Sequence, residues 1–243
     1  MKVIVIIPAA GLGSRMAGSA TGKAPAKQFT ELNGVPVLIH TLRKFAAAPG
    51  VSEIVIALRK SEAETFAPRL AQEKFTKPVR IVEGGEHRQE SVSNALRAIS
   101  AADDDLVLVH DAVRPFVDRE IIASVIDAAA KHGAAIAAVP AVDTIKQVDR
   151  TADGAVVNAT IPREHIVLVQ TPQGFRFSVL KQAFDEAARD GFTGTDEASV
   201  VERMGHAVAV VMGSPRNIKI TTPSDLELAE FYAGQEAKKF VAG

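Results

Sequence analysis

The sequence is defined first by what it lacks. It contains no cysteine, which excludes disulfides, thiolate nucleophiles and cysteine-ligated metals. An excess of basic charge is also missing, because 28 Lys+Arg stand against 29 Asp+Glu and the formal net charge is -1. A general nucleic-acid-binding protein needs a basic face, so we expect no nucleic-acid partner.

Long apolar runs are absent near the start of the chain. The run at residues 3–7 is far shorter than the ~20 residues that cross a bilayer, and Pro8 ends it. We therefore interpret it as a buried strand and not as a signal peptide or membrane span. The expected protein is cytoplasmic, with no membrane partner.

The chain has 243 residues, of which 47% are hydrophobic and 23% charged. These proportions are typical of a globular protein that can bury a large core. No repeat, low-complexity tract or linker interrupts the sequence, so we expect a single domain over residues 1–243.

Short β-branched runs alternate with longer amphipathic stretches. We predict strands at 3–7, 53–58, 79–82, 106–110 and 134–140, and helices at 37–48, 61–73, 88–100 and 118–132. Alternation of this kind predicts an α/β fold, with a mostly parallel sheet covered by helices on both faces.

The alternation stops after Pro140. Residues 143–169 show strand-like pieces at 144–148, 155–160 and 166–169 around an Asp-Gly turn, and no amphipathic helix. We interpret them as a β-arm that leaves the main sheet. Helices are predicted again at 178–189 and 196–204, followed by a strand at 207–212. A last helix opens with the cap sequence TPSD at 222–225 and is predicted to end near Ala233.

The first predicted strand leads into a glycine-rich turn, PAAGLGSRM at 8–16. Small residues let backbone N–H groups approach a ligand, and such turns bind phosphates. The dinucleotide fingerprint is excluded because Met16 stands where its third glycine belongs, and Ala17 and Ala24 break a P-loop pattern. Arg15 and Lys27 flank the turn. They either stabilise a polyphosphate or are solvated surface cations.

Four further motifs follow in the sequence. They are GGEHRQESV at 84–92, HDAVRP at 110–115, TDEAS at 195–199 and NIKIT at 217–221. Together with PAAGLGSRM and PAKQF at 25–29, in this order and spacing, they resemble the 2-C-methyl-D-erythritol 4-phosphate cytidylyltransferase family over nearly the whole chain, from Val3 to Tyr232.

The resemblance implies a Rossmann-like nucleotidyltransferase fold and a homodimer joined through the β-arm. It implies transfer of CMP from CTP to 2-C-methyl-D-erythritol 4-phosphate with release of pyrophosphate, a step in isoprenoid precursor synthesis. The acceptor phosphate is already a nucleophile, so the reaction needs charge neutralisation more than a strong base. The implied cofactor is Mg²⁺, held mainly by CTP phosphates, and we assign it no protein ligand.

The resemblance also assigns roles by matching position, and three sets follow. The catalytic cations would be Arg15, Lys27 and Lys219, the last at the end of a strand. The CTP-binding residues would be Pro8, Ala9, Ala10, Gly11, Gly85, Glu86, Ser91 and Ala112. The acceptor would meet Asp111, Arg114, Thr171 and Thr195, with Thr144 and Arg163 arriving from the partner's arm.

Several of these residues also have a purely structural interpretation. Asp111 follows a predicted parallel strand, where such sheets bind ligands, whereas Arg114 could simply pair with Asp111. Thr195 could cap the helix that follows it. His110 follows a buried run and is interpreted as a satisfied core histidine, or one that supports the site from behind, and not as a metal ligand.

The sequence departs from the family pattern at three places. Residues 18–24 lengthen the first loop, Glu86 replaces an aspartate, and Pro162 precedes Arg163. Alternative functions are a cytidylyltransferase for another polyol phosphate such as ribitol 5-phosphate, and a sugar-1-phosphate nucleotidyltransferase that uses UTP or dTTP. A silent binding module and an NAD-dependent reductase are the alternatives from other classes.

Overall fold

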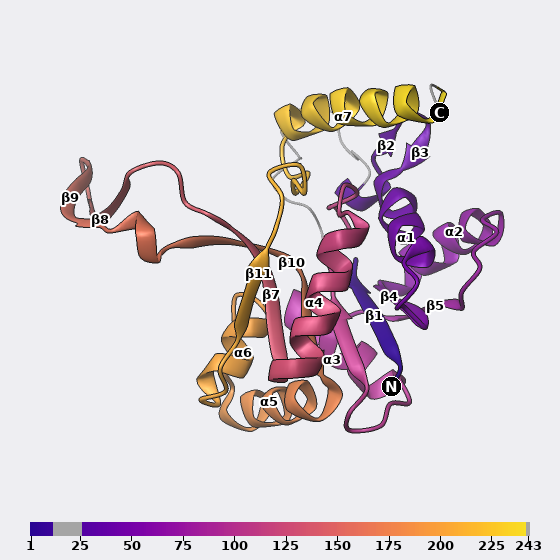
Figure 1. Cartoon of the computed structure of the whole chain (residues 1–243), viewed down its shortest axis with the longest axis horizontal. Helices are drawn as coiled ribbons and strands as arrows, with labels where there is room; N and C mark the ends of the chain where they lie inside the picture. The colour runs from indigo at the N-terminus through magenta and orange to yellow at the C-terminus, as the bar shows by residue number, and fades with distance from the viewer. Residues whose placement is uncertain (12–25, 242–243) are drawn as a thin grey trace.

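A seven-stranded mixed sheet forms the centre of the protein (Figure 1). The computed structural model describes residues 1–11 and 26–241, with side chains up to residue 236. The strand order is β11-β7-β10-β6-β1-β4-β5. The strands are β1 (Val3–Pro8), β4 (Glu53–Leu58), β5 (Val79–Glu83), β6 (Leu106–Val109), β7 (Ala134–Pro140), β10 (Val167–Arg176) and β11 (Ala209–Met212).

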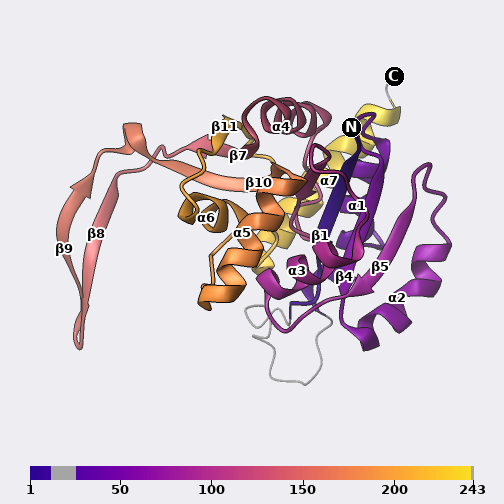
Figure 2. The same ribbon diagram turned by 90° about the horizontal axis from the view of Figure 1, so that it is seen from below.

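Helices cover both faces of this sheet, as Figure 2 shows from below. One face packs against α1 (Val37–Ala47), α2 (Lys60–Ala71) and α4 (Arg119–His132). The other packs against α3 (Arg88–Ala98), α5 (Phe177–Asp190) and α6 (Glu197–Arg203). Alternate residues of β1 contribute to the two cores, because successive side chains of a strand point to opposite faces. The expected fold class is confirmed.

Strand β10 differs from the prediction. Residues 167–169 were expected in the arm, but they open a ten-residue strand that runs antiparallel between β6 and β7 in the main sheet. Its ladder shifts register between Val169 and Gln173. This irregularity places Thr171 beside the end of β6, where Thr171 Oγ1 accepts a hydrogen bond of 3.0 Å from the backbone N–H of Asp111.

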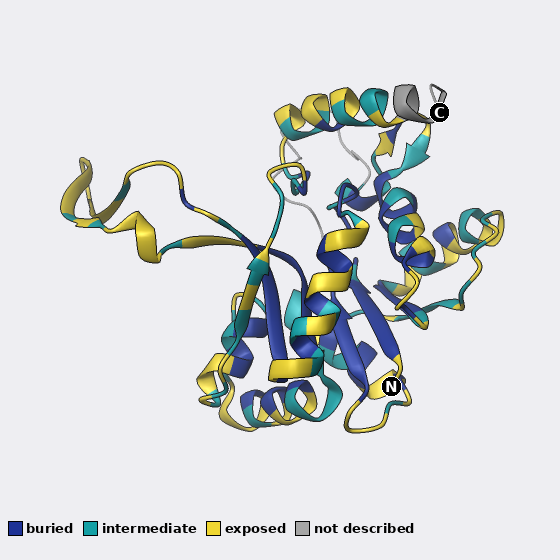
Figure 3. Ribbon diagram, viewed as in Figure 1, coloured by how far each residue is buried: buried dark blue, intermediate teal, exposed yellow. Residues whose placement is uncertain are grey.

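The arm itself is a hairpin of β8 (Ile145–Thr151) and β9 (Gly154–Ile161) that projects away from the body (Figure 1). A short 3-10 turn, η3 (Arg163–His165), leads from the hairpin back to β10. Nearly all of the hairpin is exposed in Figure 3, including apolar side chains such as Val156 and Val157, which are 61% and 55% exposed.

Two smaller elements and the last helix complete the structure. The short strands β2 (Glu31–Leu32) and β3 (Val35–Pro36) follow the 3-10 turn η2 (Lys27–Phe29). Helix α7 (Pro223–Val241) begins at the predicted cap, where Asp225 accepts backbone hydrogen bonds from Thr221 and Thr222. It continues beyond the predicted end near Ala233. No helix in the described parts of the chain is both long and apolar enough to span a bilayer.

Candidate active site

The candidate site lies where the parallel strands β1, β5 and β6 end. Strand β1 leads into Ala9 and Ala10, and β5 leads into Gly84. The two turns pack against each other so closely that a Cβ on Gly84 would lie 2.6 Å from the Cβ of Ala10. Glycine is therefore required at position 84 by the approach of the first turn, and the two loops form one surface.

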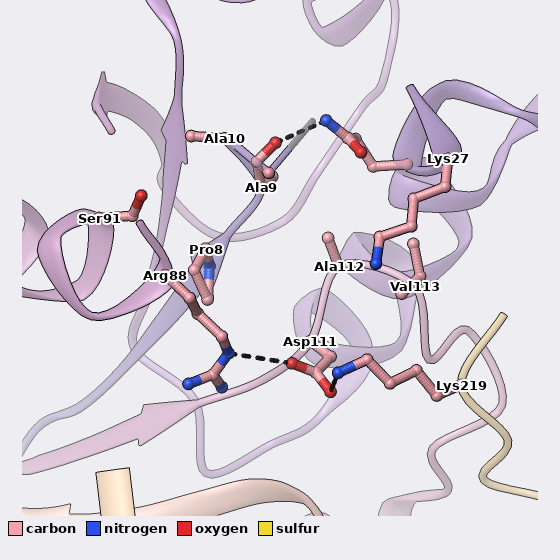
Figure 4. A pocket seen from close by; sticks show the side chains of 12 residues that line it. Pro8, Ala9, Ala10, Lys27, Arg88, Ser91, Asp111, Ala112, Val113 and Lys219 are labelled. Atoms are coloured by element: carbon pink, nitrogen blue, oxygen red, sulfur yellow. Dashed lines mark hydrogen bonds and ion pairs between the residues drawn. The ribbon is translucent and has the colours of Figure 1, made fainter. Parts of the chain in front are cut away.

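The segment that carries Lys27 is fixed to the end of β1. The side chain of Gln28 is 2% exposed, and its amide donates a 2.7 Å hydrogen bond to the Ala9 carbonyl. Thr41 of α1 similarly donates to the Ala112 carbonyl at 2.9 Å. These buried bonds fix the end of β1, the Lys27–Phe29 turn and the segment after β6 around one cleft. The Lys27 side chain lies at the edge of this cleft (Figure 4).

This cleft is lined by most of the residues predicted to bind CTP and by two of the predicted catalytic cations, Lys27 and Lys219. Arg15 lies outside the described residues, so its position is not assigned. Lining residues are Pro8, Ala9, Ala10, Gly11, Lys27, Gln28, Arg88, Ser91, Asp111, Ala112, Val113 and Lys219.

Two of the predicted nucleotide contacts lie beside this cleft. Gly85 and Glu86 line a neighbouring hollow with Arg59 and Lys60. The Ser91 hydroxyl accepts from the Gly85 backbone at 3.0 Å and donates to the His87 carbonyl at 3.0 Å. Ser91 thus holds the shape of the glycine turn while it also lines the first cleft.

Asp111 is the electrostatic centre of the site. Its carboxylate receives Arg88 Nε at 3.3 Å on one oxygen, and Arg114 Nε at 3.3 Å and Lys219 Nζ at 2.9 Å on the other. Burial alone would raise the pKa of Asp111, but the three cations outweigh it and hold this pKa well below its usual range. Asp111 therefore remains ionised and keeps the three cations together.

Arg88 joins this cluster to a second carboxylate. Its Nη1 donates to Glu197 Oε1 at 2.6 Å, and Glu197 is 1% exposed. Burial raises the pKa of Glu197 in spite of the opposing effect of Arg88. Burial also disfavours the charged form of Arg88, but Glu197 and Asp111 outweigh it and raise the pKa of Arg88. The guanidinium is thus held as a permanent cation between two carboxylates.

Arg114 and Lys219 reach Asp111 from different parts of the chain. Arg114 also donates from Nη1 to the Asn217 carbonyl at 2.6 Å. Asn217 is fully buried, and its amide donates to the Thr171 carbonyl at 2.8 Å. Lys219 follows this anchored turn in a segment without regular structure. The prediction that Lys219 ends a strand was wrong.

A second hollow lies on the other side of Asp111. Thr171 and Thr195 line it together with Arg88, Asp111, Arg114 and Lys219. The cap of α6 is Asp196, whose side chain accepts from Ser199 N, so Thr195 does not cap this helix. Arg88, Asp111 and Lys219 border both hollows.

His110 supports the site from beneath. Its ring is fully buried, with Nδ1 3.1 Å from Thr171 Oγ1 and Nε2 3.1 Å from the Arg114 carbonyl. Burial lowers the pKa of His110 to about 4. The neutral ring fixes Thr171 and the Arg114 backbone, and the interpretation of His110 as a satisfied core histidine is confirmed.

The predicted arm residues lie away from this site within the same chain. Thr144 and Arg163 are exposed at the base of the hairpin. Arg163 Nη1 donates to the Val142 carbonyl at 2.5 Å. Neither residue lines the two hollows that meet at Asp111.

The arrangement is suited to binding a polyanion. Cationic side chains and turn backbone surround a cleft at the carboxyl ends of parallel strands, where such sheets bind ligands. Sequence reasoning assigned no role to Arg88, Gln28 or Glu197. The signal that could have identified two of them is their place in the motifs: Arg88 lies in GGEHRQESV and Glu197 in TDEAS.

Comparison with known proteins gives a consistent result. Residues 3–235 match the family model described as IspD: 2-C-methyl-D-erythritol 4-phosphate cytidylyltransferase. Proteins of that name from Acidobacterium capsulatum and Solibacter usitatus are 59% and 55% identical, covering 98% of this chain and 100% and 98% of theirs. The crystal structure of the Francisella tularensis enzyme of that name is 38% identical with a TM-score of 0.78, covering 95% of this chain and 99% of that one.

A further solved structure supports the same relation. It is described as a 4-diphosphocytidyl-2C-methyl-D-erythritol synthase from Anaerococcus prevotii, and it is 30% identical with a TM-score of 0.80. The alignment covers 96% of this chain and 98% of that chain.

Proposed function

The chain belongs to the 2-C-methyl-D-erythritol 4-phosphate cytidylyltransferase family, and on that premise we propose how its residues divide the work of the reaction. The enzyme transfers CMP from CTP to 2-C-methyl-D-erythritol 4-phosphate in isoprenoid precursor synthesis. An oxygen of the acceptor phosphate bonds to the α-phosphorus of CTP. The bond from that phosphorus to the bridging oxygen breaks, and pyrophosphate leaves with the electron pair.

The observation that carries the proposal is the boundary between the two hollows. CTP occupies the cleft beside the glycine turn, and the acceptor occupies the hollow lined by Thr171 and Thr195. The reacting phosphates then meet beside Lys219 and the Asp111 cluster. Two anions must approach each other there, so fixed cations lower the barrier by offsetting their repulsion and the growing charge on the leaving group.

Individual residues take the following roles in this proposal. Arg15, Lys27 and Lys219 bind the triphosphate and stabilise the transition state. Cytosine lies against Ala9, Ala10, Gly85, Glu86 and Ser91, with Pro8, Gly11 and Ala112 completing the nucleotide site. Asp111 orients Arg114 toward the acceptor, and Thr171 and Thr195 contact it.

Mg²⁺ enters the proposal as part of the nucleotide substrate. Both oxygens of Asp111 are already paired with cations, and the described residues contain no group of three His, Asp or Glu side chains that could hold a metal. This donor set fits a Mg²⁺ ion that arrives on the triphosphate, because Mg²⁺ prefers phosphate oxygens and water. Bound there, the ion would neutralise part of the triphosphate charge.

We also propose that two copies of the chain pair through the arm. The hairpin exposes apolar side chains on an element that has no core of its own, which favours burial against a symmetry mate. Thr144 and Arg163 would then enter the acceptor hollow of the partner. We also propose that the enzyme acts in the cytoplasm, which cell fractionation can check.

Pyrophosphate release tests the substrate assignment. The enzyme is expected to use CTP far better than UTP, because a site aimed at cytosine leaves buried polar groups unpaired with uracil. 2-C-methyl-D-erythritol 4-phosphate should outcompete ribitol 5-phosphate as acceptor, and chelation of divalent ions should abolish turnover. Equal kcat/KM for the two nucleotides would refute the assignment of the nucleotide site.

Mixed dimers test the shared site. Lys27→Ala and Arg163→Ala proteins, each nearly inactive, are unfolded together and refolded. In a mixed dimer one site keeps Lys27 and receives an intact Arg163 from the partner subunit. Random pairing makes about half of the dimers mixed, so activity should recover to about a quarter of wild type. Mixed dimers that are verified by differential tags yet remain inactive would reject the shared site.

A further inference from the structure

Arg88 stands at the point where the two substrate sites meet. It lines both the nucleotide cleft and the acceptor hollow. Among the described residues that line these two hollows, Asp111 and Lys219 are the only others shared by both. Figure 4 shows Arg88 and Lys219 reaching Asp111 from opposite sides. Since transfer joins an oxygen from one hollow to a phosphorus in the other, a cation at this boundary can act on both reacting groups.

The guanidinium of Arg88 is fixed in place while part of it stays available. Its Nε donates to Asp111 and its Nη1 donates to Glu197, whereas its Nη2 makes no hydrogen bond with the described residues. The side chain is 30% exposed. An arginine carries five N–H donors in a planar fork that matches phosphate oxygens, so this residue retains donors for a ligand.

Glu197 lies in the first turn of α6 and pairs its side chain with Arg88. Its Oε1 accepts from Arg88 at 2.6 Å, whereas its buried Oε2 meets no hydrogen-bond donor among the described residues. Burying a carboxylate with one oxygen unpaired costs stability, and a buried ion pair is often no better than an apolar pair of similar volume. A costly arrangement of this kind at a substrate boundary indicates a role in the reaction.

We propose that Arg88 is a further phosphate-binding cation of this reaction and that Glu197 is the positioning residue that holds its guanidinium at the boundary. The inference rests on the proposed function. When the acceptor phosphate arrives, Arg88 donates to its oxygens while Glu197 prevents the side chain from swinging away. The planar fork fixes the direction of the phosphate as well as its charge, which a lysine would do less well.

Steady-state kinetics of three variants test the role of Arg88. Arg88→Gln is expected to lower kcat/KM for the acceptor by ~10²-fold, and Arg88→Lys by ~10-fold because it keeps the charge and loses the fork. Arg43→Gln is the matched control, since Arg43 is also bound to a carboxylate, that of Glu73, but lies on the surface of α1. The control should retain wild-type kinetics. An Arg88→Gln enzyme with at least a third of wild-type kcat/KM would overturn the proposal.

A neutral pair separates catalysis from folding. Arg88→Gln alone leaves Glu197 buried without its cation, so this variant can lose stability. The double variant Arg88→Gln/Glu197→Gln removes both charges and should recover most of the melting temperature. If Arg88 binds phosphate, the activity of the double variant stays ~10²-fold below that of wild type even though its melting temperature has recovered. If activity returns to within a few-fold of wild type, the ion pair is structural and the proposal is wrong.

Glu197→Gln alone tests positioning. Arg88 keeps its charge and its contact with Asp111 but loses the shorter of its two ion pairs, so kcat is expected to fall by ~10-fold while KM for CTP changes by less than about twofold. A loss of melting temperature with unchanged kcat would overturn the positioning role. The wild-type assay distinguishes failure of the proposed function from failure of the role proposed for Arg88. Wild-type turnover with methylerythritol phosphate and a fully active Arg88→Gln enzyme would reject only the role of Arg88, whereas no wild-type turnover would reject both.

Discussion

His110 should make the stability of this enzyme fall in mild acid. Its ring is fully buried beneath the Asp111 cluster, and both ring nitrogens are engaged by Thr171 and the Arg114 carbonyl. Protonation would place a cation in a buried site near Arg88 and Arg114. Burial therefore lowers the pKa of His110 to about 4 from 6.5.

The size and sign of the effect follow from proton linkage. The unfolded chain binds the proton near pH 6.5, whereas the folded protein binds it near pH 4. The stabilising contribution is thus fully present above the unfolded pKa and is lost as pH falls toward the folded pKa. For these two pKa values the loss is about 2 kcal/mol between pH 7 and pH 5, and about 3 kcal/mol by pH 4.

Urea unfolding at a series of pH values measures this contribution. Wild type and His110→Gln are compared at one protein concentration, because glutamine keeps a donor and an acceptor but does not titrate. The difference in unfolding free energy between the two proteins removes the contributions of groups that titrate alike in both. This difference should shrink by about 2 kcal/mol from pH 7 to pH 5. A difference that stays constant over this range would refute the account of His110.

Three further substitutions probe the catalytic charge, the nucleotide turn and the anchored turn. Lys27→Ala should lower kcat by ~10²–10³-fold with little change in melting temperature, and turnover within a few-fold of wild type would remove Lys27 from the catalytic set. Gly84→Ala should cost ~1–3 kcal/mol and raise KM for CTP, because its Cβ would meet Ala10 at 2.6 Å; unchanged melting and KM would contradict this packing. Asn217→Ala should cost ~1–3 kcal/mol by leaving the Thr171 carbonyl unpaired, and calorimetry that finds no loss would show that water replaces the amide.

The centre of the main sheet was predictable because most of its strands are buried on both faces. Strand β4 is apolar after Glu53 and β7 is apolar throughout, and the bounds of both match the prediction. Only the start of strand β10 was predicted, and it was assigned to the arm, because the middle of the strand contains the buried polar residues Gln170, Thr171 and Gln173, which line the proposed acceptor hollow. A run of this composition resembles a loop in sequence.

Local patterns also misled the prediction near the C-terminus. Ile218 and Ile220 flank Lys219 with strand-like alternation, but Ile220 is buried in a small core beside α7 and its N–H bonds to the Val113 carbonyl. Helix α7 continues through Gly234, although glycine in a helix costs about 1 kcal/mol and commonly marks its end.

The ion pair of Arg88 with Glu197 could not be predicted from the sequence. The two residues are 109 positions apart, and no pattern in the sequence around either one indicates the contact. Asp111 was identifiable since its position after a parallel strand is informative by itself. Sequence thus predicts residues whose place in one element determines their role. It does not predict residues whose role depends on which distant segments the sheet order brings together.

In the proposed site, the Asp111 cluster allows three cations to gather during folding, before any anionic ligand binds. Arg88, Arg114 and Lys219 would repel one another if they lay this close together without a counter-charge. Asp111 supplies that charge at the centre and, through its own backbone N–H, is tied to Thr171 of β10. The same contacts set the directions of the cations, so little reorganisation is needed when phosphate oxygens enter. A preformed site of this kind stabilises the transition state more effectively than mobile surface cations, because the cost of ordering the charges is met during folding.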